Sequence, residues 1–235
     1  MAAWLMNLEW DAVIQIIIID ILLGGDNAVV IALACRNLPP RSRRLGIIWG
    51  AAGAIILRVI LITVAVAMLN IPLLKLVGGL LLLWIGVKLL APVEDEGEHA
   101  SIKASDKLWA AIKTIIVADF VMSLDNVIAI AGAAEQADPS QRTGLIIFGL
   151  LVSVPFIVFG SQLILKLLDR FPVIVLLGAA LLGWIAGGLI VGDVWVKPLL
   201  PDHVLVGYIG SELGAVAVVL IAKLLARRRG KAGAA

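Results

Sequence analysis

Two short motifs place acids and amides at the same spacing about one hundred residues apart. Their oxygens are hard ligands, which suit Mg²⁺, Ca²⁺ and Mn²⁺ better than copper or zinc. The single cysteine, Cys35, excludes cysteine clusters and intramolecular disulfides. The motifs therefore predict a site for a hard divalent cation, while a monovalent cation or a proton pathway stays open. The candidate ligands are Asp20, Asp26, Asn27, Asp119, Asp125 and Asn126.

Both motifs lie in very apolar sequence. Hydrophobic residues make up 62% of the 235 residues and charged residues only 15%, which is the composition of a membrane protein. A helix needs about 20 apolar residues to cross the hydrocarbon core, and seven stretches are long enough. The expected fold is therefore an all-α membrane protein with seven transmembrane helices. The stretches are 10–35, 45–69, 72–91, 108–133, 143–167, 172–192 and 204–226.

Four aspartates inside such helices require an explanation, because a charge at mid-bilayer costs at least about 2.5 kcal/mol. Buried, protonated acids that bond neighbouring helices are one alternative. We expect instead that the acids face inward, where they bind a cation or relay protons. Asp20 and Asn27 lie within about 20° of each other on a regular helix. The pair Gly24 and Gly25 favours a local unwinding that would redirect Asp26, whereas the second motif lacks these glycines.

The chain repeats itself. Residues 16–34 align without a gap on residues 115–133, and residues 72–85 match residues 172–185. Each copy holds three spans, so the second copy enters the membrane from the opposite face and the repeat is inverted. The whole chain, 1–235, is then a single transmembrane domain. Its predicted parts are repeat 1 at 10–91, a cytoplasmic linker at 92–107, repeat 2 at 108–192 and a seventh helix at 204–226.

The basic residues predict the orientation. With the N-terminus outside, fifteen Lys and Arg lie on the cytoplasmic side and three, Lys75, Arg142 and Lys197, on the other. The net charge of +2 therefore reflects topology, and a nucleic-acid partner has little support. Residues 1–9 carry no Lys or Arg, so we expect the first span to be retained rather than cleaved as a signal peptide.

Other intramembrane polar residues have more than one interpretation. Arg58 in the second span and Glu212 in the seventh could pair with each other or with an aspartate, or could be snorkelling or simply buried. Ser123 and Ser153 are predicted to make hydrogen bonds between helices. Small residues four positions apart predict close helix packing, and they are Gly183, Gly187, Gly210 and Gly214.

These residues resemble a known family. The segments 20–33 and 119–132, followed by Gly160-Ser161-Gln162, look like the TerC family of integral membrane proteins, and most like its YjbE/YkoY-type bacterial branch. The similarity covers roughly residues 10–195. It implies the fold of the LysE-like transporter superfamily, a bacterial inner membrane location and export of Mn²⁺ from the cytoplasm. The family's motif acids and amides correspond to the six candidate ligands named above.

The leading hypothesis is a secondary transporter that exports a divalent cation by alternating access. The resemblance favours Mn²⁺ as the transported substrate. No segment resembles a nucleotide-binding loop, and no catalytic or cofactor-binding residues are predicted. A membrane scaffold that assists metalation of secreted proteins is one alternative, and an intramembrane enzyme with paired aspartates is another. The expected partners are the metal ion and the lipid bilayer. The ligands alone do not select among Mn²⁺, Mg²⁺ and Ca²⁺. The sequence also leaves open the coupling ion, the direction of flux and the oligomeric state, including a homo-oligomer.

The predicted topology can be tested with reporters fused after the last residue. The basic residues place the C-terminus in the cytoplasm, so a C-terminal fluorescent protein should be bright and a C-terminal alkaline phosphatase inactive. The opposite pattern of activity would contradict an odd number of spans with the N-terminus outside.

Overall fold

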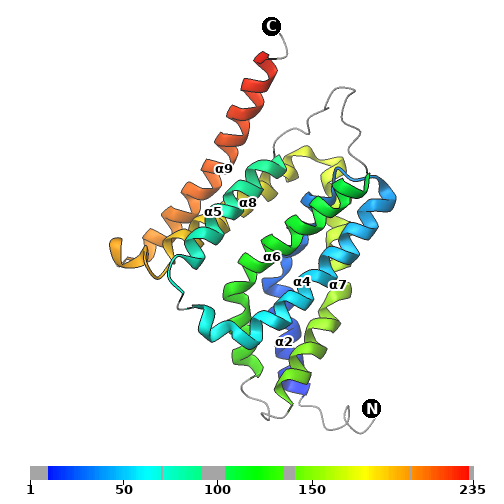
Figure 1. The fold of residues 1–235 in the computed structure, drawn as a ribbon, viewed down its shortest axis with the longest axis vertical. Helices are drawn as coiled ribbons and strands as arrows, with labels where there is room; N and C mark the ends of the chain where they lie inside the picture. Colours follow the sequence, from blue (N-terminus) through cyan, green and yellow to red (C-terminus); the bar gives the residue numbers. More distant parts are fainter. Residues whose placement is uncertain (1–9, 70, 91–103, 135–140, 202, 233–235) are drawn as a thin grey trace.

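The computed structural model describes residues 10–69, 71–90, 104–134, 141–201 and 203–232, and all regular structure within them is helical (Figure 1). Eight α-helices and one short 3₁₀ helix follow one another along these residues. Their bounds are α2 Trp10–Leu23, α3 Gly25–Cys35, α4 Pro40–Leu69, α5 Leu74–Leu90, α6 Ala104–Ala134, α7 Arg142–Arg170, α8 Pro172–Val191, η1 Lys197–Leu199 and α9 Val204–Ala232.

The helix limits follow from the sequence and from the solvent. In hydrocarbon every backbone N–H and C=O must find a partner within the chain, and a helix provides these partners locally. Proline marks two helix starts, at Pro40 and Pro172, where its missing N–H costs nothing. Between α7 and α8, Phe171 is extended and donates its N–H to the Leu167 carbonyl at 2.7 Å. A single residue thus separates two long helices.

The membrane spans are confirmed in part. In the described residues, four helices are long and apolar enough to cross a bilayer alone, within α4, α7, α8 and α9. The pair α2 and α3 passes the same test together, bent by 47°, which gives up to five. Helix α5 has only 17 residues, and α6 carries Lys113 and Asp119 within its apolar run. The structure therefore supports a multi-pass membrane protein, and the count of seven remains a prediction.

The predicted linker at 92–107 lies largely outside the described residues. Helix α6 already begins at Ala104, so the last four residues of that range are helical rather than part of a loop. The first turn of α6 contains Asp106, whose charge suits the partly positive N-terminal end of a helix. The other predicted spans agree with the helices to within a few residues, except that α4 and α9 extend further.

The helices form two groups that lie side by side (Figure 1). In the first group α4 lies along α6, and α7 packs against α2 and α3. In the second group α5 and α9 both pack on α8. The end of α2 that begins the described chain and the end of α9 that closes it lie at opposite ends of the molecule (Figure 1).

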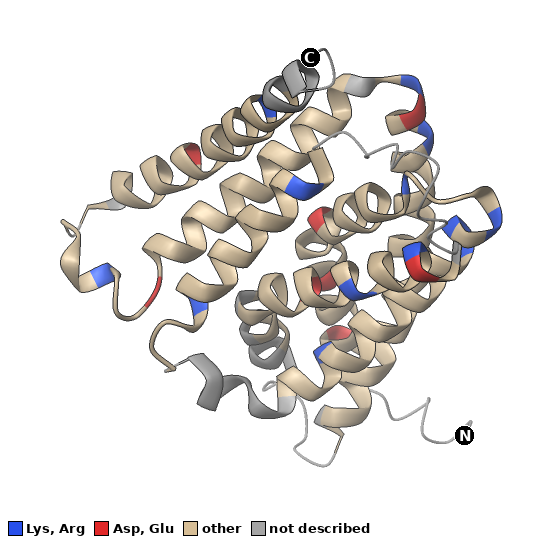
Figure 2. Cartoon of the chain, turned by 45° about the horizontal axis from the view of Figure 1, so that its top comes forward, with Lys and Arg blue, Asp and Glu red and all other residues tan. Residues whose placement is uncertain are grey.

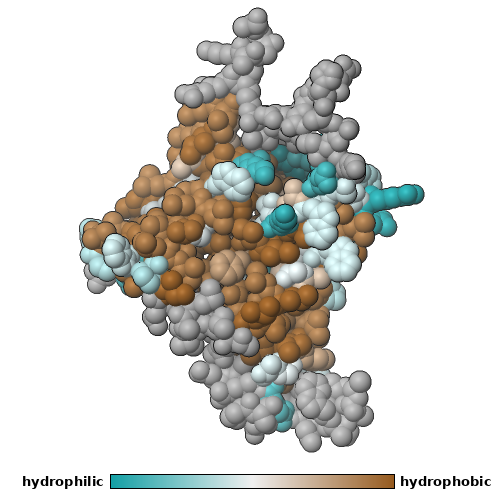
Figure 3. Space-filling model, in the orientation of Figure 1, coloured by the Kyte–Doolittle hydropathy of each residue, from teal (hydrophilic) through white to brown (hydrophobic). Residues whose placement is uncertain are grey.

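The surface has the character expected for a protein in lipid. A band of hydrophobic side chains crosses the middle of the face in Figure 3, and hydrophilic side chains gather near its upper edge. Large apolar side chains point outward, such as Ile56 on α4, which is 63% exposed, and Leu213 on α9, which is 64% exposed. Figure 2 shows most basic residues near helix ends, whereas several acidic residues lie in the interior. These acids are the ones that need partners.

Close approach of α8 and α9 confirms the predicted glycine contact. A Cβ added to Gly187 would overlap the Gly210 carbonyl, and one added to Gly183 would overlap the Gly214 carbonyl. The backbones therefore touch, as in other membrane helices with small residues four apart. The seventh predicted span packs on α8 through this glycine contact, and it also contacts α5.

The contact predicts a difference between two alanine substitutions on the same helix. Gly214→Ala should lower the thermal unfolding temperature in detergent, because its Cβ would meet the backbone of α8. Gly207→Ala should have no such effect or raise the temperature slightly, since nothing lies within 4 Å of its Cβ position and alanine favours helix. Equal effects of the two substitutions would contradict the packing described here.

Candidate cation site

The first motif is interrupted by a break in its helix. Gly24 separates α2 from α3 with φ −93° and ψ 0°, and its N–H donates to the Asp20 carbonyl at 2.7 Å. A Cβ at this position would overlap that same carbonyl, so only glycine fits. The predicted unwinding is therefore confirmed at Gly24. The second motif lies within the continuous helix α6, as the absence of glycines there suggested.

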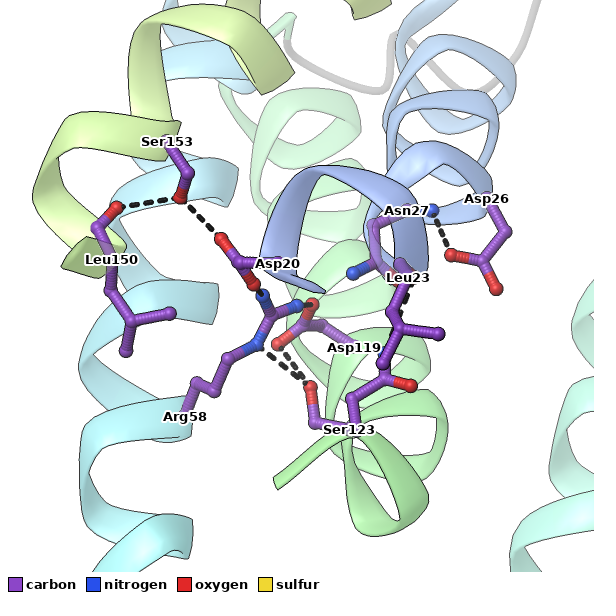
Figure 4. A network of polar contacts seen from close by, with 10 residues as sticks. Asp20, Leu23, Asp26, Asn27, Arg58, Asp119, Ser123, Leu150 and Ser153 are labelled. Atoms are coloured by element: carbon purple, nitrogen blue, oxygen red, sulfur yellow. Dashed lines mark hydrogen bonds and ion pairs between the residues drawn. The ribbon is translucent and has the colours of Figure 1, made fainter. Parts of the chain in front are cut away.

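Arg58 of α4 joins the two motifs. Its Nη1 donates to Asp20 of α2, and its Nη2 donates to Asp119 of α6 at 2.7 Å (Figure 4). Arg58 and Asp20 are each 2% exposed and Asp119 is 4% exposed, so all three are removed from solvent and lipid. We call these three residues the aspartate–arginine centre. Two carboxylates and one guanidinium leave a formal charge of −1.

Two serines complete the hydrogen bonding of the centre. Ser123 accepts a hydrogen bond from Arg58 Nε at 3.1 Å and donates to Asp119 Oδ2 at 3.1 Å. Ser153 of α7 has its hydroxyl oriented toward Asp20 Oδ2 and lies 2.8 Å from the Leu150 carbonyl. Both serines are fully buried, and the prediction that they bond between helices is confirmed. Each carboxylate oxygen of the centre thus faces a donor.

Asn27 lies beside the centre without hydrogen-bond partners for its side chain. The side chain belongs to a residue that is 4% exposed, and neither its amide nitrogen nor its amide oxygen has a partner. With Asp119 it lines a small cavity of about 10 Å³, whose other walls are Val30, Ile31 and Ile115. That volume holds about one water molecule. A buried amide of this kind is costly unless a ligand or water satisfies it.

Asp26 and Asn126 make their hydrogen bonds to the backbone rather than to the centre. Asp26 accepts a hydrogen bond from the Asn27 N–H at 2.8 Å and points away from Arg58 (Figure 4). Asn126 donates to the Leu23 carbonyl at 3.3 Å, which satisfies a carbonyl at the end of α2. The side chain of Asp125 is outside the described part. Within that part, no three His, Cys, Asp or Glu side chains are grouped to hold a metal.

The structure also resolves an alternative that the sequence left open. Arg58 pairs with two aspartates and not with Glu212, whose side chain is exposed on α9. The two partners are 38 and 61 residues from Arg58 in the sequence. Pairing between helices at such separations depends on packing, which the sequence pattern does not contain.

Comparison with known proteins identifies similar sequences. The profile described as "Integral membrane protein TerC family" matches residues 6–231. Membrane protein YjbE of Bacillus subtilis is 43% identical over 83% of this chain and 88% of its own length. YceF of the same organism is 24% identical, over 76% of this chain and 70% of its own. Both are described only as uncharacterized membrane proteins. No solved structure matches this chain.

A further buried acid, Asp193, was not singled out from the sequence. It lies in the turn after α8 and accepts hydrogen bonds from the N–H groups of Leu73 at 3.2 Å, Leu76 at 3.0 Å and Trp195 at 2.9 Å. It therefore caps the N-terminus of α5 from another part of the chain. Burial alone would raise the pKa of Asp193, but the backbone donors outweigh it and hold the pKa below its ordinary value. The signal in the sequence is an Asp directly after a helix-ending glycine.

This cap predicts a stability effect that depends on pH. A carboxylate with a depressed pKa stabilises the fold above about pH 4, and this contribution is lost as pH falls through the folded-state pKa. Asp193→Ala should lower stability by about 1–2 kcal/mol at neutral pH. Asp193→Asn should lose less, because an amide oxygen still accepts. Thermal unfolding of wild type and both variants at pH 7 and pH 3.5 checks this, and an equal gap between wild type and Asp193→Ala at both values would contradict it.

Proposed function

Because the chain belongs to the TerC family of integral membrane proteins, we propose that it is a secondary transporter that exports a divalent metal cation, with Mn²⁺ as the transported substrate. The observation that carries the proposal is the aspartate–arginine centre next to the partnerless amide of Asn27. Charged groups this deep in an apolar bundle mark ion pathways more often than they stabilise a fold.

The chemistry of the donors supports a hard cation. The polar side chains around the cavity offer carboxylate and amide oxygens, which suit Mn²⁺, Mg²⁺ and Ca²⁺. The single cysteine, Cys35, is buried in an apolar cluster with Leu38 and Ile47 and adds no ligand to the centre. The proposed substrate path includes the six motif residues, namely Asp20, Asp26, Asn27, Asp119, Asp125 and Asn126.

The packing supports two inverted repeats that exchange their roles. In the predicted repeats, α2 with α3 corresponds to α6, α4 corresponds to α7, and α5 corresponds to α8. The contact of α4 with α6 therefore corresponds to the contact of α7 with α2 and α3, and both contacts are extensive. The equivalent helices α5 and α8 pack against each other, as expected for a pair related by the symmetry of the repeats. The two equivalent motifs nevertheless differ in backbone, since one is broken at Gly24 and the other is continuous. Such an asymmetry suits alternating access, in which the described arrangement is one of two.

An intramembrane aspartate enzyme is less well supported. An aspartic dyad works because two carboxyl groups lie together and share one proton. Here the guanidinium of Arg58 lies between Asp20 and Asp119 and bonds both. A positive charge between the two carboxylates suits a cation-binding site better than a pair of acids that share a proton. We therefore propose transport rather than catalysis.

The proposal predicts the behaviour of the second acid of each motif. Asp26→Asn and Asp125→Asn should each weaken Mn²⁺ binding and reduce flux into sealed proteoliposomes by about 100-fold, because on this proposal each acid turns to the cation in one state of the transport cycle and the substitution removes its charge while conserving size. The double variant should lose little more than either single variant, since residues that hold one ion act as a unit. Glu212→Gln is the matched control, as this acid is exposed on α9, and its flux should equal that of wild type.

Several results would decide against this reading. Binding without flux in wild type would favour a scaffold that assists metalation, and neither binding nor flux would defeat the transport proposal. Wild-type affinity in both single variants and the double variant would remove Asp26 and Asp125 from the set of ligands. Additive losses would indicate two independent sites rather than one.

A further inference from the structure

The guanidinium of Arg58 occupies the position that a cation would take between the two repeats. It binds one oxygen of Asp20 from the first motif and one oxygen of Asp119 from the second. The other oxygen of each carboxylate faces a serine hydroxyl, from Ser153 and Ser123. All four carboxylate oxygens are therefore in use. A divalent ion that binds both carboxylates must displace at least the guanidinium.

We propose that Arg58 is a tethered competitor of the transported cation, which neutralises Asp20 and Asp119 when the carrier is empty and leaves them when the cation binds. This inference rests on the transport function proposed above. It assigns Arg58 a role in release of the substrate and in the return of the empty carrier, beyond holding helices together.

Charge balance gives the first reason. Without Arg58 the empty centre would carry two carboxylates, −2, inside a bundle that admits almost no solvent. With Arg58 the charge is −1, and with a divalent ion in place of Arg58 it is 0. Arginine keeps its charge inside proteins, so it can replace a metal ion without exchange of a proton. The empty carrier thereby avoids exposing two unpaired carboxylates to the apolar interior during its return.

The surroundings of Asp119 give the second reason. The partnerless oxygen of Asn27 and the small cavity lie next to this carboxylate, on elements α3 and α6. An entering ion can meet Asn27 and Asp119 there before Arg58 has left Asp20. Competition therefore proceeds in steps, because one arm of the guanidinium is displaced first. The tether of Arg58 on α4 keeps the competitor at a high local concentration.

Net transport and exchange separate this role from a structural one. Arg58→Gln should bind Mn²⁺ at least 10-fold more tightly than wild type, lose most net efflux and retain exchange of Mn²⁺ across the membrane. Exchange survives because the loaded carrier needs no competitor to return. Arg58→Lys keeps a charge but bonds fewer acceptors, so its affinity should rise by a smaller factor of about 3 to 10 and part of its net efflux should remain.

The matched control is Arg43→Gln. Arg43 also pairs with an aspartate, Asp169 at 2.8 Å, but this pair is exposed, so affinity and flux should be those of wild type. Thermal unfolding and gel filtration identify any variant that has not folded. If Arg58→Gln does not fold, the affinity of Arg58→Lys decides the question.

Two outcomes overturn the inference in different ways. Wild-type flux together with an unchanged or weaker affinity in the folded Arg58 variants overturns the inference and leaves the transport proposal intact. Absence of Mn²⁺ binding and flux in wild type overturns the transport proposal, and the inference with it. Tighter binding with exchange retained and net efflux lost supports both.

Discussion

The double ion pair of Arg58 is the constraint on which the rest of the bundle depends. It brings α2, α4 and α6 to one point where none of the three charges reaches water. Taken alone, any one of these groups would be expensive to insert, and removing one partner of a buried ion pair typically costs about 3–5 kcal/mol. The close packing of α4 on α6 is consistent with this constraint, since it holds Arg58 beside Asp119.

The features that the sequence predicted depend on short-range rules. The lengths of the apolar stretches located the helices, because every helix that crosses the hydrocarbon core needs about 20 apolar residues. The break at Gly24 follows from two adjacent glycines, and the contact of α8 with α9 follows from glycines four residues apart. Ser123 and Ser153 were expected to bond between helices, since a hydroxyl in lipid has few other choices. Each of these rules can be applied to a single stretch of sequence, without knowing which helix lies beside it.

The features that the sequence did not predict depend on the relative depth and rotation of separate helices. For Arg58 the sequence left both Glu212 and an aspartate open as partners. Helical periodicity predicts the face of a helix on which a residue lies, but not which residue of a neighbouring helix lies at the same depth in the membrane. Asp193 caps α5 across a separation of 117 to 120 residues, so no local pattern marks its partners. Asp26 was expected to turn toward the centre after the break, yet the free N–H groups at the start of α3 offer its carboxylate a partner at once.

The cap that Asp193 places on α5 also ties three helices to one another. The turn between α8 and α9 is tied to the start of α5, and the glycine contact fastens α9 to α8, so these three helices are joined at several points along their length. The helices of the first group meet at the aspartate–arginine centre and also pack through apolar side chains, some of them against α5 and α8. In the transport cycle proposed above, α5, α8 and α9 therefore form one unit whose connections involve none of the charges of the aspartate–arginine centre. Replacing Arg58 by a metal ion in that cycle would change bonds of α2, α4 and α6 and leave the connections of α5, α8 and α9 intact.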